Sequence, residues 1–79
     1  MTNVKIYTTN SCVYCNKAKT WMKANNVKFQ EINVENDPQA QEELVNKTGQ
    51  FGVPVIEVGG RMMIGWNEST FRNMIEELN

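Results

Sequence analysis

The two cysteines of this 79-residue chain constrain its fold most, because they stand close together as Cys12-Val-Tyr-Cys15. Residues 3–8 before them alternate in the manner of a β-strand, whereas helix formers dominate the residues after them, to about Asn25. The pair therefore lies where a strand ends and a helix begins. Positions i and i+3 share one face of a helix, so the two thiols can reach disulfide distance with little backbone movement.

Several kinds of site use two cysteines at this spacing. A self-contained zinc site needs four ligands, and the chain has no other cysteine and no histidine. A structural disulfide across four residues would restrict the unfolded chain by about 2 kcal/mol, compared with about 3 kcal/mol for a 15-residue loop. The pattern therefore favours redox chemistry, and the alternatives are a metal or iron–sulfur site shared between two chains and an inert pair.

Composition and charge exclude several classes of protein. The length suits one domain over residues 1–79, and 41% hydrophobic with 22% charged residues is typical of a folded soluble chain. The net charge of −1 is spread along the chain without a run of like charges, so neither nucleic acid nor an anionic membrane is an expected partner. The N-terminus lacks the pattern of a signal peptide, and the expected location is the cytoplasm.

The middle of the chain predicts a strand and a helix. Residues 27–34 carry strand-forming side chains, but their alternation changes phase midway, which suits an edge strand. A helix is predicted from about Pro38 to Thr48, because Asp37 can cap its free amides and Pro38 suits the first helical position. Gly49 suits the end of this helix.

The last third of the chain predicts a hairpin and a final helix. Residues 53–58 are rich in β-branched side chains, and Gly59-Gly60 favours a tight turn into a strand at 61–64. Asn67 can cap the helix that follows. Its apolar face has residues at positions i, i+3, i+4 and i+7, namely Phe71, Met74, Ile75 and Leu78.

The resulting order, β-α-β-α-β-β-α, predicts an α/β fold. The β-α-β start implies two parallel strands joined by a right-handed crossover, and the hairpin must join the same sheet antiparallel. We therefore expect a four-stranded mixed sheet flanked by three helices, with both faces covered. The cysteine pair then lies at the carboxyl edge, where open α/β sheets usually place their chemistry.

The two cysteines are expected to have different roles. Free amides and the positive end of the helix dipole favour a thiolate at Cys12, whereas Cys15 lies one turn inside on an apolar face. Cys12 is thus the predicted nucleophile toward a substrate disulfide, and Cys15 the resolving thiol. Pro54 could simply open a strand, but we expect a cis bond between Val53 and Pro54. Tyr14 and Trp66 are predicted either to contact a partner or to be ordinary surface aromatics.

Three stretches together resemble the thioredoxin superfamily, and within it the glutaredoxins and the NrdH-type redoxins that deliver electrons to ribonucleotide reductase. The stretches are Val4-Lys-Ile-Tyr-Thr8 followed by the cysteine motif, then Gly52-Val-Pro-Val55, and Ile64-Gly-Trp66. The resemblance covers nearly the whole chain. It implies a thioredoxin fold, Cys12 as nucleophile, Cys15 as resolving thiol, and a cis-Pro54 beside which the Val53 backbone pairs with the bound partner.

The sequence departs from glutathione-using glutaredoxins at several positions. Those proteins usually have proline at the position of Val13, and many have lysine at the position of Thr9 to bind the glutathione carboxylate. Many also read Gly-Gly-Cys-Asp where this chain reads Gly65-Trp-Asn-Glu68. The pair Gly65–Trp66 is similar to NrdH-type redoxins, whereas Tyr14 is glutaredoxin-like.

The resemblance implies a small cytoplasmic protein-disulfide reductase that cycles between a dithiol and a Cys12–Cys15 disulfide. We expect no bound cofactor and no metal, with NADPH supplying electrons through thioredoxin reductase rather than through glutathione. The alternatives are a glutathione-dependent glutaredoxin and a dimer that binds a [2Fe–2S] cluster through Cys12. The expected partners are disulfide-containing proteins, with ribonucleotide reductase as one candidate, and the expected state is a monomer.

Overall fold

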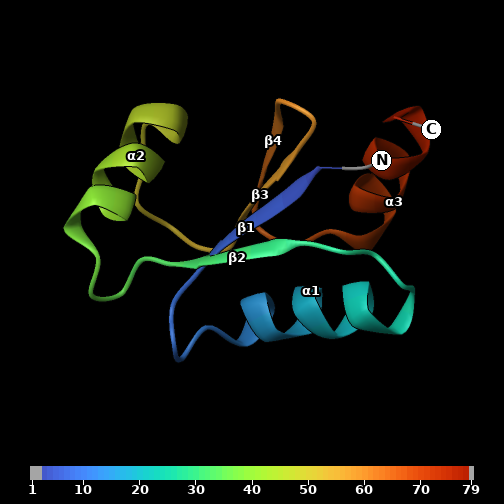
Figure 1. Cartoon of the computed structure of the whole chain (residues 1–79), viewed down its shortest axis with the longest axis horizontal. Helices are drawn as coiled ribbons and strands as arrows, with labels where there is room; N and C mark the ends of the chain where they lie inside the picture. The colour runs from blue at the N-terminus through green and yellow to red at the C-terminus, as the bar shows by residue number, and fades with distance from the viewer. Residues whose placement is uncertain (1–2, 79) are drawn as a thin grey trace.

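The computed structural model describes residues 3–78, without the side chain of Leu78. The elements follow the predicted order: β1 (Val4–Thr8), α1 (Val13–Ala24), β2 (Gln30–Asn33), α2 (Pro38–Thr48), β3 (Val55–Val58), β4 (Arg61–Ile64) and α3 (Glu68–Leu78). Figure 1 shows the three helices arranged around the strands. None of the described helices is long and apolar enough to cross a membrane.

The four strands form one mixed sheet in the order β2-β1-β3-β4. β1 pairs in parallel with β2 and antiparallel with β3, and β3 pairs antiparallel with β4. The β1–α1–β2 unit is thus a crossover between parallel neighbours, as predicted. The edge position predicted for the second strand is confirmed, because among the described strands β2 pairs only with β1.

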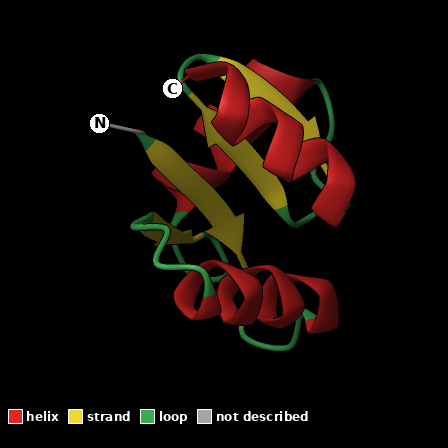
Figure 2. Cartoon of the chain, turned by 90° about the vertical axis from the view of Figure 1, so that its right-hand side faces the viewer, coloured by secondary structure: helices red, strands yellow, loops and turns green. Residues whose placement is uncertain are grey.

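Apolar residues cover both faces of the sheet. One core cluster joins β1 to α1 and α3: Val4, Ile6, Ala18, Met22, Phe71 and Met74. The other joins β1 and β3 to α2: Tyr7, Val34, Ala40, Leu44 and Val55. The alternation along β1 therefore sends successive side chains into opposite cores. Figure 1 accordingly shows α2 and α3 on opposite sides of the strands, and Figure 2 shows the molecule from the α3 side.

The predicted helix ends of α2 and α3 are confirmed by their hydrogen bonds. The Asp37 carboxylate accepts from the Ala40 N–H at 3.2 Å, and Gly49 ends α2 in the left-handed region at φ +72°. The Asn67 side chain accepts from the Thr70 N–H at 3.0 Å at the start of α3. Short-range sequence signals therefore set these ends.

Two strands begin two or three residues later than the sequence predicts. β2 begins at Gln30 rather than at residue 27, because the chain changes faces there: Val27 and Phe29 pack against the cluster beneath α1 and α3, whereas Ile32 packs against the one beneath α2. β3 begins at Val55 rather than at residue 53. Proline has no N–H for a strand ladder, which accounts for a start after Pro54. The contact predicted for the Leu78 side chain lies outside the described residues.

Candidate active site at the start of helix α1

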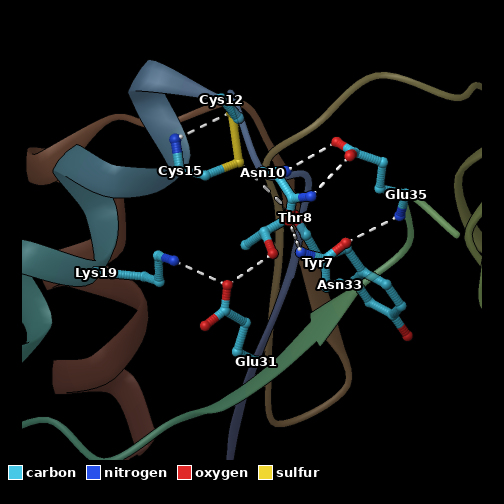
Figure 3. A network of polar contacts seen from close by, with 9 residues as sticks. All are labelled: Tyr7, Thr8, Asn10, Cys12, Cys15, Lys19, Glu31, Asn33 and Glu35. Atoms are coloured by element: carbon cyan, nitrogen blue, oxygen red, sulfur yellow. Dashed lines mark hydrogen bonds and ion pairs between the residues drawn. A yellow bond between two sulfur atoms is a disulfide. The ribbon is translucent and has the colours of Figure 1, made fainter.

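Cys12 and Cys15 are joined by a disulfide, with their Cα atoms 5.2 Å apart (Figure 3). Cys12 is the N-cap of α1, with the extended backbone angles φ −82° and ψ 110°. Its Sγ accepts a hydrogen bond from the Cys15 N–H at 3.1 Å. A cysteine sulfur thus occupies the place where a serine or aspartate oxygen usually caps a helix.

The two sulfurs differ in their surroundings. Cys12 is partly exposed, whereas Cys15 is fully buried. The Cys15 Sγ lies 4.0 Å from the Tyr7 carbonyl oxygen, at the end of β1. One cysteine can therefore meet a second molecule, and the other is shielded by the sheet.

The electrostatics of the helix start favour negative charge on the exposed sulfur. The first turn of α1 contains no acidic residue, so nothing in that turn competes for its free N–H groups. A sulfur at the N-cap faces these groups and the positive end of the helix dipole. Both effects stabilise a thiolate at this position once the disulfide is reduced.

The loop before β3 and the turn before α3 meet beside this helix start. The Val53–Pro54 bond is cis, as the sequence predicts, and Pro54 is buried. The Gly65 N–H donates to the Pro54 carbonyl at 2.8 Å. Within residues 3–78, the N–H and C=O of Val53 form no hydrogen bond. This short stretch of backbone is thus available to pair with another chain.

Trp66 has both a packing role and an exposed edge. Its ring centroid lies 6.0 Å from that of Trp21 and 5.4 Å from that of Phe71, so part of the ring covers the core. The ring also lines a surface groove of about 640 Å³ that runs along α1 and begins at Val13, next to Cys12 in the chain. The sequence predicts Trp66 on the rim of a groove that holds Cys12 and Pro54. Neither of those two residues lines the groove beside Trp66, whose other lining residues are on α1 and at Glu68.

Exposed apolar side chains surround the same end of the molecule. Tyr14 is 59% exposed on α1, with the Lys17 ammonium 5.3 Å from its ring centroid, and Val13 beside it is 63% exposed. Phe51, in the loop before Val53, is half exposed. The exposure of Val13 and Phe51 was not predicted from the sequence, because exposure depends on which face of an element packs.

A polar network next to the cysteines was also missed (Figure 3). The buried Thr8 hydroxyl donates to the Glu31 carboxylate at 2.8 Å, and the Lys19 ammonium contacts the same oxygen at 2.8 Å. The Lys19 hydrogen bond lowers the pKa of Glu31, and burial opposes it. These contacts join α1 to both β1 and β2. Their partners lie far apart in sequence, which local patterns do not reveal.

Metal ligands are sparse in the part of the chain that the structure describes. No group of three or more His, Cys, Asp or Glu side chains is gathered there to hold a metal ion. Cys12 and Cys15 are instead bonded to each other as a disulfide.

Comparisons with known proteins agree with this geometry. Residues 4–63 match the glutaredoxin family. An uncharacterized glutaredoxin-like 8.6 kDa protein of Clostridium pasteurianum is 36% identical, over 94% of this chain and 99% of its own. Glutaredoxin 3 of Escherichia coli is 32% identical over 86% of this chain and 82% of its own.

The fold is likewise similar to that of a solved NrdH-redoxin from Escherichia coli, with a TM-score of 0.78 and 30% identity over 90% of this chain and 92% of that one. That protein is described as glutaredoxin-like with a thioredoxin-like activity profile. By its family match, its fold and its cysteine pair, this chain belongs to the glutaredoxin family of thiol–disulfide oxidoreductases.

Proposed function

We propose that this chain reduces disulfides in other proteins through Cys12 and Cys15, and that thioredoxin reductase is a better electron donor to it than glutathione. The observation that carries the proposal is the asymmetry of the pair. Cys12 is partly exposed at the N-cap of α1, and Cys15 is buried one turn further along. An exposed thiolate can attack a substrate disulfide, whereas a buried thiol reacts only after the mixed disulfide has formed.

The reaction proceeds in two exchanges. The Cys12 thiolate attacks one sulfur of the substrate disulfide, forming a mixed disulfide and releasing the other substrate sulfur as a thiolate, which takes up a proton. The Cys15 thiol then loses its proton and attacks the Cys12 sulfur, so that the substrate leaves with two thiols and the Cys12–Cys15 disulfide forms. Two electrons from NADPH, delivered by a reductase, restore the dithiol.

Partner binding uses the features around Cys12. The unpaired backbone of Val53 can add to an extended partner segment as a short strand. Tyr14 and Trp66 offer aromatic surface on α1 and at the start of α3, and Gly65 holds the turn that carries Trp66 against Pro54. Aromatic anchors are enriched among the residues that dominate protein–protein affinity.

Two substitutions argue against glutathione as the preferred donor. Thr9 supplies no cation for a glutathione carboxylate, and Trp66 occupies the sequence position where, by the resemblance, many glutaredoxins have a glycine that lets glutathione approach the backbone. A protein donor needs neither feature. The likeness to a redoxin described as having a thioredoxin-like activity profile supports the same choice.

Competing reductants test the proposal. The oxidised protein is mixed with NADPH and thioredoxin reductase in one cuvette, and with NADPH, glutathione reductase and glutathione in another, and NADPH oxidation is followed. We expect faster oxidation with thioredoxin reductase. Faster oxidation with glutathione would replace the proposal by a glutathione-dependent glutaredoxin. A Cys12→Ser control should be inactive in both.

A further inference from the structure

We infer that Glu35 is a positioning residue for the thiol chemistry, because its carboxylate holds the turn that carries Cys12. The turn comprises residues 9–12, between β1 and α1. Glu35 lies in the segment after β2, at the same edge of the sheet (Figure 3). The inference rests on the nucleophilic role proposed for Cys12, but it does not depend on which reductant supplies electrons.

Asn10 and Glu35 meet through two hydrogen bonds. The backbone N–H of Asn10 donates to Glu35 Oε1 at 3.0 Å, and its side-chain amide donates to Glu35 Oε2 at 2.7 Å. Asn33 adds a third contact, because its amide donates to the Asn10 side-chain oxygen at 2.7 Å. Hydrogen bonds to an ionised carboxylate are stronger than neutral ones, and here both oxygens serve one residue.

The segment that carries the Glu35 carboxylate is itself held by hydrogen bonds. The Glu35 N–H donates to Asn33 Oδ1 at 2.9 Å, and the Val34 N–H donates to the Thr8 carbonyl at 2.9 Å. From the other side, the Gln41 amide of α2 donates to the carbonyls of Val34 at 2.6 Å and Glu35 at 3.2 Å. Glu35 thus transmits the rigidity of β2 and α2 to the turn.

The turn needs this support because it has little packing of its own. Asn10 and Ser11 are exposed, and no core cluster includes either residue. In the oxidised protein the disulfide also restrains Cys12. Once that bond opens, Cys12 is held by the turn and by the Asn16 N–H, which donates to the Cys12 carbonyl at 3.2 Å, and the turn helps keep its sulfur within reach of the Cys15 N–H, which it meets at 3.1 Å. The Asn10–Glu35 clamp, which consists of the two hydrogen bonds between these residues, therefore acts mainly on the reduced, reactive form of the protein.

The charge of Glu35 and its hydrogen bonds have opposite effects on the Cys12 thiolate. A negative charge near a thiol raises its pKa, so removing that charge alone would make Cys12 more reactive near neutral pH. Losing the clamp lets the sulfur leave the helix N-terminus, which removes the stabilisation of the thiolate and makes Cys12 less reactive. Whether Cys12 becomes less or more reactive when Glu35 is replaced thus distinguishes a positioning role from a purely electrostatic one.

Glu35→Gln provides the test, with Glu42→Gln as its matched control. Glu42 is an exposed residue of α2 whose side chain forms no hydrogen bond or ion pair with the described residues. The reduced proteins are alkylated with iodoacetamide between pH 5 and 9, and the modified cysteine is identified by mass spectrometry. We expect Glu35→Gln to slow Cys12 alkylation at pH 7 by about 2- to 10-fold, equivalent to one lost hydrogen bond. Glu42→Gln should match the parent.

A double-mutant cycle checks the route of the effect. If Glu35 acts through Asn10, then Asn10→Ala should slow alkylation similarly, and the Asn10→Ala/Glu35→Gln double variant should be no slower than Asn10→Ala alone. Alkylation of Cys12 in the Glu35→Gln variant at or above the parent rate would overturn the inference. Preferential alkylation of Cys15 in the parent would instead contradict the role proposed for Cys12, so the two failures are distinguishable.

Discussion

The Gly65 N–H donates to the Pro54 carbonyl at 2.8 Å, and this bond ties the turn before α3 to the loop before β3. Gly65 has a φ of +89°, which favours glycine. The next residue, Trp66, packs on Trp21 of α1 and lines the groove along that helix. The position of this ring thus depends on a backbone contact made within a short motif.

Donor specificity should change when Trp66 and Thr9 are replaced together. Trp66→Gly combined with Thr9→Lys opens the backbone and adds a cation, so turnover with glutathione should rise and turnover with thioredoxin reductase should fall. The measurement is NADPH oxidation with each donor. Because Trp66 also packs on Trp21 and Phe71, a urea midpoint must first establish that the variant is folded under the assay conditions. An unchanged preference in the folded variant would contradict the role assigned to Trp66.

The Cys12→Ser and Cys15→Ser variants should fail at different steps of the reaction. Cys12→Ser should abolish disulfide reduction, because a serine hydroxyl is essentially un-ionised at neutral pH. Cys15→Ser should leave a mixed disulfide on Cys12, because the resolving thiol is missing. Mass spectrometry of the protein with a disulfide substrate, before and after a reductant, detects that adduct. Trapping on Cys15 in the Cys12→Ser variant instead would reverse the assigned roles.

The parts of the site that the sequence predicts are those with local signals. Cys12 and Cys15 are neighbours on a helix, and the caps Asp37 and Asn67 act within one turn of their own position. The cis bond before Pro54 was also predicted, from its place after a glycine-bearing loop and from the cysteine motif earlier in the chain.

The parts that were missed depend on long-range packing. The clamp on Asn10 and the contact between Thr8 and Glu31 join residues more than 20 positions apart. Such pairs follow from the register of β1 against β2, where Thr8 lies beside Asn33. No periodicity within one segment contains this information. The predicted length of β2 is wrong for a similar reason, because Val27 and Phe29 pack against the core without joining the hydrogen-bonded strand ladder.

The buried phenol of Tyr7 should contribute measurably to stability. Its hydroxyl donates to the Glu43 carboxylate at 2.8 Å and accepts from the Lys47 ammonium at 3.1 Å, which joins β1 to α2. Tyr7→Phe keeps the ring and removes these bonds, so the free energy of unfolding should fall by about 1 kcal/mol. Urea denaturation provides the measurement. Tyr14→Phe alters an exposed ring and should change stability by less, and an equal loss in both variants would refute the prediction.

The ion pair of Lys19 with Glu31 should make stability depend on pH. The Lys19 hydrogen bond lowers the pKa of Glu31 below its usual 4.5, so the folded state favours the carboxylate more than the unfolded state does. This contribution is present above the unfolded pKa and is lost as the pH falls through the folded pKa. Lys19→Gln should therefore be less stable than the parent at pH 6 to 7, and the difference should shrink in acid.

Urea unfolding between pH 3 and 7 measures that difference, and Lys28→Gln is the matched control. Lys28 is exposed and forms no ion pair with the described residues, so its replacement should leave the pH profile parallel to the parent's. The shape of the Lys19→Gln curve is decisive, since a general effect of net charge would appear in both variants. A stability difference that stays constant down to pH 3 would mean that Lys19 supports α1 through its aliphatic stem rather than through the carboxylate of Glu31.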